Sequence, residues 1–322
     1  MGKQTINDMK ICSPFNNSFL ELSDYNNTDI KFKDFNINDI AKIKHYLEIN
    51  NSRSCDFSVG GILIWADLFK YQYAELHDSL IIKGFIPERG LSIFYEPLGK
   101  MSHDELRNLV SEINRRSTSD FKIIKNEEIE CNPTDIIEDL DENYLPEFKE
   151  YLYPIEKFCD FPGKKMEKKR NHLHYFQKNY YPYEIGEINK EITSKLIDFT
   201  KKFEFEHEKS VCSDYECQQI ENVLDLYDKY PFEGIYICKD GEILGYSFGE
   251  IINDTFIIHA EKGNTAYRGV YQAIASEMAK LVALKYPQVR YLNREDDMGD
   301  EHLRQSKMSY HPTLFIQKRL TV

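Results

Sequence analysis

The stretch GIYICKDGEILGYSFGEIINDTFIIHA (residues 234–260) decides the fold, because it predicts three strands joined by two tight turns. Apolar and β-branched residues fill 234–239, 243–252 and 255–260. The sequences KDGE (239–242) and ND (253–254) between them are typical of turns that join antiparallel strands. We therefore expect an antiparallel meander in the second half of the chain.

Helical patterns flank this meander on both sides. Apolar residues at helical spacing predict helices over 191–209 and 216–230 before it and over 267–285 after it. A strand over 289–293, a short helix over 300–308 and a last strand over 313–318 follow. The expected order of elements in this half is therefore α-α-β-β-β-α-β-α-β.

The first half repeats nearly the same order without obvious sequence identity. The predicted elements are helices over 38–49 and 58–69, strands over 71–76, 79–85 and 91–96, a helix over 102–116, a strand over 121–125 and a helix near 134–143. We interpret this as a tandem duplication, with an N-terminal domain over 1–150 and a C-terminal domain over 151–322. The joint lies near 144–165, a stretch that contains Pro146, Pro154, Pro162 and Gly163.

Helix–helix–meander–helix–strand is the element order of the GNAT acyltransferase fold. We therefore predict an α/β (α+β) protein made of two GNAT-like units, each a mixed sheet flanked by helices. A fold analogy does not identify a substrate, which has to be argued from the site.

Composition limits the classes of function. The 322 residues carry a net charge of −13, which disfavours general binding to nucleic acid or to anionic membranes but leaves room for a local basic patch. The seven cysteines are scattered without a CxxC pair, and no signal peptide is visible, so we expect reduced thiols, no metal site and a cytoplasmic location. No apolar run approaches the roughly 18 residues of a membrane span.

Two strand ends in the second half carry chemistry, and ligands of open α/β sheets bind at the carboxyl ends of strands. Glu261 emerges at the first of these ends, where a carboxylate can orient or deprotonate an amine, although a surface ion pair is the alternative. Arg268-Gly269 then forms half of a phosphate-binding loop at a helix N-terminus, with Thr265 as the expected cap. Tyr271 stands where a second small residue is wanted, so Gly269 is alternatively a packing residue.

The second strand end is the stretch NREDDMGDEHLRQSK (residues 293–307). Its clustered carboxylates repel one another unless they share a cation or a ligand ammonium. Asp300 can cap the next helix, and Arg304 and Lys307 lie three residues apart on it. Acids on a loop facing bases on a helix suit a zwitterion such as an amino acid. The alternative is a capped helix with solvated charges.

The third candidate is the strongest basic run in this acidic chain, FPGKKMEKKRNHLHYFQKNY (residues 161–180). Aromatic residues interleave with its lysines and arginine, a combination that phosphate-rich or single-stranded RNA ligands use. A solvated helix face is the alternative.

These three stretches together resemble the DUF2156 proteins, a family related to the C-terminal domain of phosphatidylglycerol lysyltransferases. The pattern NRED-D-G---LR-SK-SY-P within 293–312 is specific, and SVGGILIWADLFKYQY (58–73) resembles the N-terminal half of the family. The resemblance covers nearly the whole chain. It implies a tandem GNAT fold, as in the Fem peptidoglycan transferases, and transfer of an aminoacyl group from aminoacyl-tRNA to an amine or hydroxyl.

The expected function is therefore a soluble aminoacyl- or acyltransferase with tRNA as a partner and a small molecule or lipid headgroup as acceptor. No further cofactor is expected, and the oligomeric state stays open. Two alternatives remain: an N-acyltransferase that uses acyl-CoA, and a non-catalytic module that binds an amino-acid-like ligand.

The candidate residues fall into three groups. We assign catalysis to Glu261, Asp296 and Lys307, with Lys307 or Arg304 helping to stabilise an oxyanion. The candidates for substrate binding are Asn293, Arg294, Asp297, Arg304, Tyr310, Tyr267 and Arg268. The candidates for phosphate or tRNA binding are Lys164, Lys165, Lys168, Lys169, Arg170 and Asn171.

Overall fold

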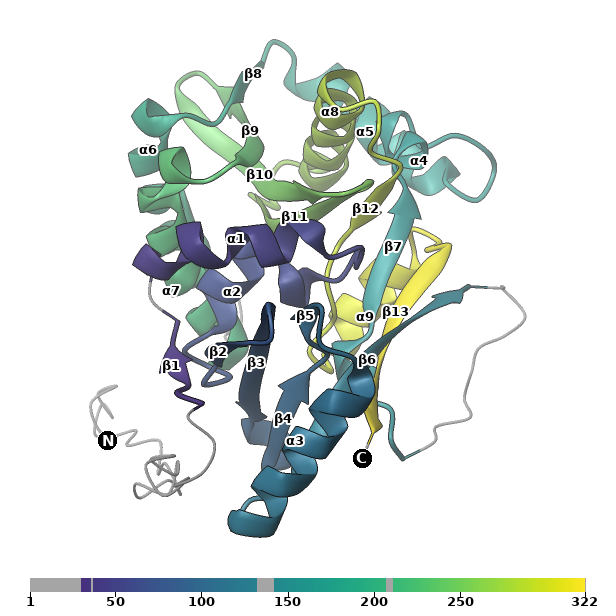
Figure 1. Cartoon of the computed structure of the whole chain (residues 1–322). Helices are drawn as coiled ribbons and strands as arrows, with labels where there is room; N and C mark the ends of the chain where they lie inside the picture. Colours follow the sequence, from purple (N-terminus) through teal and green to yellow (C-terminus); the bar gives the residue numbers. More distant parts are fainter. Residues whose placement is uncertain (1–29, 36, 132–141, 207–210, 322) are drawn as a thin grey trace, which may run out of the picture.

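The computed structural model describes residues 30–35, 37–131, 142–206 and 211–321 (Figure 1). The helix predicted near 134–143 falls almost wholly outside these residues.

The first half follows the predicted order closely. Its elements are β1 (Lys33–Asp34), α1 (Ile40–Ile49), α2 (Val59–Trp65), β2 (Gln72–Leu76), β3 (Ser79–Ile86), β4 (Leu91–Tyr95), β5 (Leu98–Gly99), α3 (His103–Arg116) and β6 (Phe121–Glu130). Helix α3 begins at a capping box, in which the Ser102 side chain accepts from the backbone of Glu105 and the Glu105 side chain accepts from that of Ser102.

The second half contains the predicted meander and its flanking helices. Its elements are α6 (Lys190–Glu206), α7 (Val211–Asp225), β9 (Phe232–Lys239), β10 (Glu242–Ile252), β11 (Thr255–Gly263), α8 (Val270–Lys285), β12 (Tyr291–Asn293), α9 (Glu301–Met308) and β13 (Leu314–Thr321). The elements between the halves were not predicted: β7 (Glu150–Pro154), α4 (Glu156–Cys159), α5 (Glu167–Tyr180) and β8 (Glu184–Glu187).

Both halves contain the same parallel strand pair, joined by a crossover helix. In the first half β4 pairs in parallel with β6 through α3, and in the second half β11 pairs in parallel with β12 through α8. In each half an antiparallel meander precedes the pair. The predicted tandem GNAT-like fold with a mixed sheet flanked by helices is thus confirmed.

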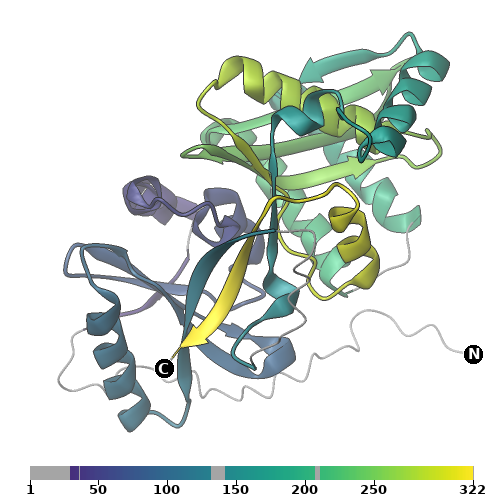
Figure 2. The same cartoon turned by 90° about the vertical axis from the view of Figure 1, so that its right-hand side faces the viewer.

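The two halves are joined by an exchange of strands. Strand β13, from the end of the chain, pairs with β6 of the first half, and β7 pairs with β12 of the second. Since β7 and β13 also pair with each other, the strands of the described residues form one continuous sheet of thirteen (Figure 2). The domain division at residue 150, which coincides with the first residue of β7, stays a prediction.

Strand β7 is the most buried connection between the halves. Tyr151, Leu152 and Tyr153 are all inaccessible to solvent, and β7 has a neighbouring strand on each edge. The central strand of the sheet therefore lies within the proline-containing joint predicted for 144–165.

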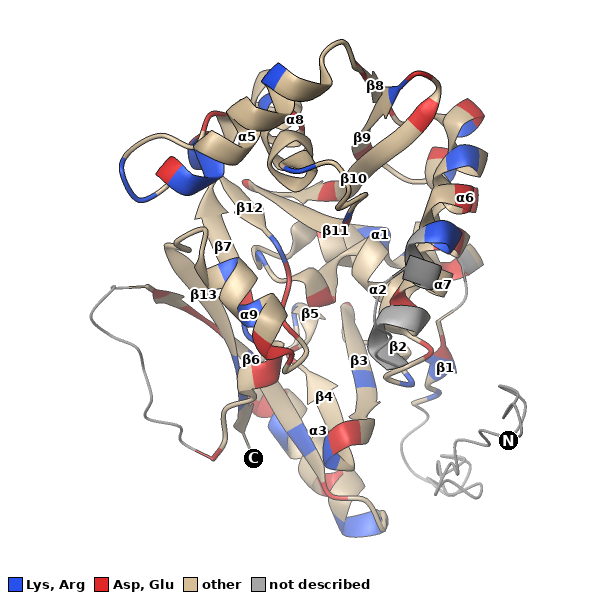
Figure 3. Ribbon diagram, turned by 180° about the vertical axis from the view of Figure 1, so that it is seen from behind, with Lys and Arg blue, Asp and Glu red and all other residues tan. Residues whose placement is uncertain are grey.

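Helix α5 and the loop before it lie against α8. The loop carries Lys164 and Lys165, which are exposed, and it forms the blue segment that protrudes beside α5 in Figure 3. The basic run is therefore gathered on one side of the second half.

No helix within the described residues combines the length and apolarity that crossing a membrane requires. The described cysteines Cys55, Cys131, Cys159, Cys217 and Cys238 are free thiols.

Replacing Leu152 with Ala tests whether β7 holds the halves together. Leu152 is fully buried on β7, which lies between β12 and β13, so truncating its side chain should lower the free energy of unfolding by about 2–5 kcal/mol, as measured by urea denaturation. The matched change Leu284→Ala, at an exposed position on α8, should shift it by less than about 0.5 kcal/mol. Equal effects of the two substitutions would contradict this role of β7.

Candidate functional site

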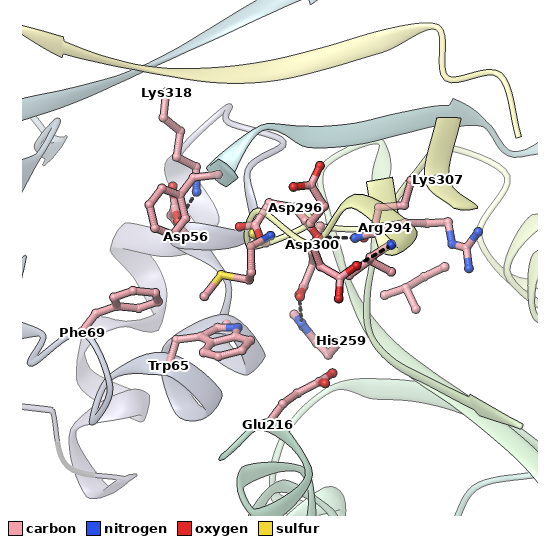
Figure 4. A pocket seen from close by; sticks show the side chains of 18 of the residues that line it. Asp56, Trp65, Phe69, Glu216, His259, Arg294, Asp296, Asp300, Lys307 and Lys318 are labelled. Atoms are coloured by element: carbon pink, nitrogen blue, oxygen red, sulfur yellow. Dashed lines mark hydrogen bonds and ion pairs between the residues drawn. The ribbon is translucent and has the colours of Figure 1, made fainter. Parts of the chain in front are cut away.

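A cavity of about 290 Å³ lies between the two halves of the chain (Figure 4). The first half contributes an apolar wall that contains Trp65, Phe69, Tyr71, Tyr95 and Phe148. The second half contributes the charged wall, formed by β11 and by the segment that follows β12. Large clefts with convergent polar groups are where small-molecule sites usually lie.

The charged wall exists because β11 and β12 separate. Their parallel pairing covers only Thr255–Ile257 and Tyr291–Asn293, whereas β11 continues to Gly263. Residues 258–262 of β11 and 294–298 after β12 therefore line the cavity where a paired strand would otherwise lie. The predicted position of the site, at the carboxyl ends of these strands, matches the location of this cavity.

Glu261 and Arg294 form an ion pair in this opening. Arg294 Nη2 lies 2.6 Å from Glu261 Oε1, and the two side chains are only 14% and 7% exposed. Glu261 Oε2 and Arg294 Nη1 are buried and have no hydrogen-bond partner among the described residues. Burial raises the pKa of the Glu261 carboxyl, against the opposing effect of Arg294. The pair therefore keeps one acceptor atom and one donor atom without a partner among the described residues.

Asp296 and Lys307 also line the cavity, but they differ in how they are held. Burial raises the pKa of Asp296 to about 7, although Lys318 and Lys307 oppose this shift. The Lys307 ammonium donates to the backbone oxygens of Arg294 and Asp296. Lys307 thus fixes the backbone of this loop. For the predicted contribution to an oxyanion hole, its ammonium would have to use an N–H that is not engaged in these two bonds.

Asp297 and Arg304, both predicted to bind substrate, bind each other. Arg304 donates from Nε and Nη2 to the two carboxylate oxygens of Asp297 at 3.0 and 2.9 Å. Asp297 is fully buried and also accepts from Tyr151 Oη and from the backbone of Gly299. With all these partners, Asp297 holds the loop and has little capacity left for a ligand.

Asn293 and Tyr310 likewise support the site, through contacts with neighbouring residues. Asn293 Nδ2 donates to Glu150 Oε2 at 2.6 Å, and its Oδ1 accepts from the backbone of Glu295 at 2.8 Å. Tyr310 is buried, with the Arg294 guanidinium 4.8 Å from the centre of its ring. Neither residue lines the cavity. Asp300 caps α9 by accepting from Leu303, as predicted.

Tyr267 and Arg268 lie away from the cavity. Tyr267 packs edge-on against Tyr180, and the Arg268 guanidinium lies 4.6 Å from the ring centre of Tyr175. These contacts attach the start of α8 to helix α5.

Most of the predicted phosphate-binding residues are exposed around the N-terminus of α5: Lys164, Lys165, Lys168 and Asn171. Arg170 instead donates to the backbone oxygens of Phe161 and Gly163, which closes the preceding loop. Lys169 turns towards the site, since its Nζ donates to Ser309 Oγ at 2.6 Å and lies 3.7 Å from the ring centre of Tyr310. Burial and the neighbouring cations lower its pKa to about 8.

The predicted phosphate loop is closed by helix α5. Helix α8 begins at Val270, later than predicted, and its N-cap is Gly269 with φ near +90° in place of the predicted Thr265. A Cβ atom at Gly269 would overlap the backbone oxygen of His172, so glycine is needed for α5 to approach this closely. Gly269 is thus a packing residue.

His259 is a cavity residue that was not among the predicted site residues. Its ring nitrogens lie 2.8 Å from Glu250 Oε1 and from Glu295 Oε1, and the side chain is fully buried. Burial lowers its pKa, but the two carboxylates outweigh burial and raise the pKa to about 9. A Cβ at Gly60 would overlap the ring, so the Gly60-Gly61 pair was the available signal.

Comparison with known proteins agrees with this architecture. A curated protein from Mycoplasmoides gallisepticum, "Uncharacterized protein MYCGA3080", is 28% identical over 171 residues, which are 53% of this chain and 54% of that protein. The match thus spans about half the length of that relative. A solved structure from Bacteroides thetaiotaomicron, described as a conserved protein of unknown function, is 25% identical with a TM-score of 0.73, covering 91% of this chain and all of that one.

A second solved structure is the C-terminal domain (DUF2156) of a putative lysylphosphatidylglycerol synthetase from Agrobacterium fabrum. It has a TM-score of 0.57 at 12% identity and covers 88% of this chain and 91% of that domain, which shows a shared fold. The family model described as "Phosphatidylglycerol lysyltransferase, C-terminal" matches residues 48–320. Since that match spans most of the sequence, this chain belongs to the family of phosphatidylglycerol lysyltransferase C-terminal domains.

Proposed function

We propose that this protein transfers an aminoacyl group from an aminoacyl-tRNA to an amine or hydroxyl of an acceptor molecule. Membership of a family named for a lysyltransferase supports a transferase activity. The Glu261–Arg294 pair lines the cavity and has one buried acceptor atom and one buried donor atom without a partner among the described residues, and this is the observation that carries the proposal.

The two free atoms match the two polar ends of an aminoacyl ester. The α-ammonium of the donor binds Glu261 Oε2, and the ester carbonyl oxygen accepts from Arg294 Nη1. During attack this oxygen becomes negatively charged, and a fixed, buried guanidinium stabilises it more strongly than it stabilises the neutral carbonyl. Glu261 keeps Arg294 oriented throughout.

Asp296 is the proton acceptor in this proposal. The attacking nitrogen or oxygen of the acceptor forms a bond to the ester carbon and passes its proton to Asp296. The carbon–oxygen bond to the tRNA ribose then breaks, and the ribose oxygen takes a proton. A carboxylate with a pKa of about 7 suits this exchange at neutral pH, because it accepts and returns a proton at little cost.

The basic run supports tRNA as the source of the aminoacyl group. Lys164, Lys165 and Lys168 are exposed around the start of α5, and Lys169 connects this surface to Tyr310, which packs against Arg294 of the site. Lysine clusters bind phosphates by charge, so an RNA backbone can lie on α5 while its acylated end enters the cavity. The backbone of α5 against Gly269 leaves little room for the pyrophosphate of acyl-CoA at the start of α8.

The acceptor then lies against the apolar wall of the first half. Trp65 and Phe69 face the charged wall across the cavity (Figure 4), and Phe148 also lines it, so an acceptor with an apolar portion and one amine or hydroxyl fits between the two walls.

Replacing Glu261 with Gln tests the role of the ion pair. The amide keeps the shape but loses the charge that binds the ammonium, so transfer from labelled lysyl-tRNA or alanyl-tRNA should fall about 100-fold. Transfer is measured as label recovered in lipid or in small-molecule acceptors. The control Glu301→Gln, an exposed residue on α9, should retain wild-type activity.

Undiminished transfer by the Glu261→Gln protein would exclude this role for Glu261. Tight binding of aminoacyl-tRNA by the wild type without any turnover would instead support a non-catalytic binding module.

Acetyl-CoA distinguishes the proposal from an acyl-CoA enzyme. Because α5 covers the start of α8, we expect no change in Tm when acetyl-CoA is added at micromolar concentrations in a thermal-shift assay. Lysyl-tRNA should raise the Tm through preferential binding to the folded state. Stabilisation by acetyl-CoA alone would overturn the choice of donor.

Asp296→Asn tests the pKa on which the proton transfer depends. An Asp with a pKa of about 7 when folded and 3.8 when unfolded holds its proton more tightly in the folded state. The wild type therefore loses stability as the pH rises from about 4 to 7, whereas an Asn at this position does not titrate.

The free energy of unfolding of Asp296→Asn, relative to the wild type, should consequently be higher at pH 8 than at pH 4, as measured by denaturant titration. The control Asn171→Ser changes an exposed residue of α5 that carries no titratable group, so its difference from the wild type should stay constant with pH. A constant difference for Asp296→Asn would show that its pKa is not raised. Transfer by this variant should also be lost.

A further inference from the structure

The first half contains a cavity of its own, of about 360 Å³. It lies where the parallel pairing of β4 and β6 ends, at Tyr95 and Ile124. Beyond this point the chain leaves the pair at Glu96 while β6 continues to Glu130, so Glu96 and Asn126 line the space between them. This is the same place in the repeated unit as the opening between β11 and β12. The carboxyl ends of diverging strands are where α/β sheets bind ligands.

Three residues that line this cavity carry a buried polar atom without a hydrogen-bond partner among the described residues, and one of these atoms is His103 Nδ1. Asn50 Nδ2 and Asn126 Oδ1 are inaccessible and have no hydrogen-bond partner among the described residues. The other amide atoms are engaged, since Asn50 Oδ1 accepts from the backbone of Ser52 and Asn126 Nδ2 donates to Asp56. Buried polar groups in native proteins are nearly always paired, so one free donor and one free acceptor in a cavity indicate a ligand that pairs with both.

The charges around the cavity favour a cationic ligand. Burial raises the pKa of the Glu96 carboxyl. Two nearby groups oppose this rise only in part: His103, whose Nδ1 lies 3.4 Å from the carboxyl, and Lys125. Glu128 accepts a hydrogen bond from Arg53 at 2.7 Å. Arg53 also donates two hydrogen bonds to Asp254, so its single positive charge is shared between two carboxylates. A cation placed beside Glu96 would restore part of the stabilisation that this carboxylate loses on burial.

The rest of the lining is apolar and closed to anions. Phe57, Leu98, Met101 and Ile316 are buried side chains of the lining. The N-terminus of α3, which could attract an anion, is already occupied by the Ser102–Glu105 capping box. A ligand here needs an apolar stem between its polar ends.

We propose that this cavity binds a small primary amine that also carries a hydroxyl or carbonyl oxygen. The ammonium group faces Glu96 and Asn126 Oδ1, the oxygen accepts from Asn50 Nδ2, and the stem packs on Phe57 and Met101. The site is separate from the cavity at Glu261 and requires no reaction, so it goes beyond the proposed transferase activity.

Titration calorimetry of the full chain with 5-amino-1-pentanol tests this proposal. We expect binding with a dissociation constant on the order of 1 mM, and at least about tenfold weaker binding to Glu96→Gln and to Asn126→Ala. The variant Glu261→Gln should bind the amine as the wild type does. The uncharged analogue 1,5-pentanediol should not bind, because it has no ammonium group for Glu96.

Circular dichroism of each variant establishes that it is folded, and the pair of variants at two positions keeps the test usable if one fails to fold. Absence of binding to the wild type at tens of millimolar amine, or equal binding of the diol, would overturn the proposal. So would loss of binding in Glu261→Gln with retention in Glu96→Gln, which would place the amine in the other cavity. The proposed transferase activity is measured separately, so failure of one leaves the other intact.

Discussion

The arrangement of the two halves depends on the ion pairs that the buried Lys318 ammonium forms. Lys318 lies on β13, is 3% exposed, and reaches Asp56 Oδ1 at 2.7 Å and Glu150 Oε1 at 3.4 Å. These three residues come from the last strand, from the segment before α2 and from β7. Removing Lys318 would leave two buried carboxylates without their shared counter-ion, which is costly, whereas with Lys318 in place their burial is tolerated. The set therefore links the paired strands β13 and β7 to the segment before α2.

The shape of the candidate site depends on these contacts. Glu150 also accepts from Asn293 at the end of β12, and Asn293 in turn orients Glu295 at the start of the charged loop. From there Lys307 holds the backbone of the loop and Asp297 attaches it to Arg304 and Tyr151. With the loop held at so many points, Arg294 and Glu261 can remain in a geometry that leaves one atom of each unpaired. Buried polar groups of this kind persist only where the surrounding structure restrains them.

The repeated unit explains why each half of the chain has a cavity at the same place. Each half opens a gap where its parallel strand pair ends, and the residues that line the gap differ between the halves. The second half places Arg294 and Glu261 in its gap, opposite aromatic residues of the first half. The first half places Glu96 and two half-satisfied asparagines in its own. One fold thus offers two sites of different chemistry, because the backbone sets the position of the gap and the side chains set its ligand.

The sequence by itself determined the local elements and much of the candidate site. Hydrophobic periodicity and turn residues predicted the meander at 234–260, its flanking helices and their repetition, because these signals act over a few neighbouring residues. Glu261 and Asp296, which were predicted as catalytic residues from the strand ends and from the family resemblance, both line the cavity. Only the tertiary structure decided the strand exchange, the role of β7, the burial of His259 between two carboxylates, and the engagement of Lys307 and Asp297 within the loop. These features are pairings between residues up to hundreds of positions apart, and a local pattern carries no information about which distant partner a charge or strand edge will meet.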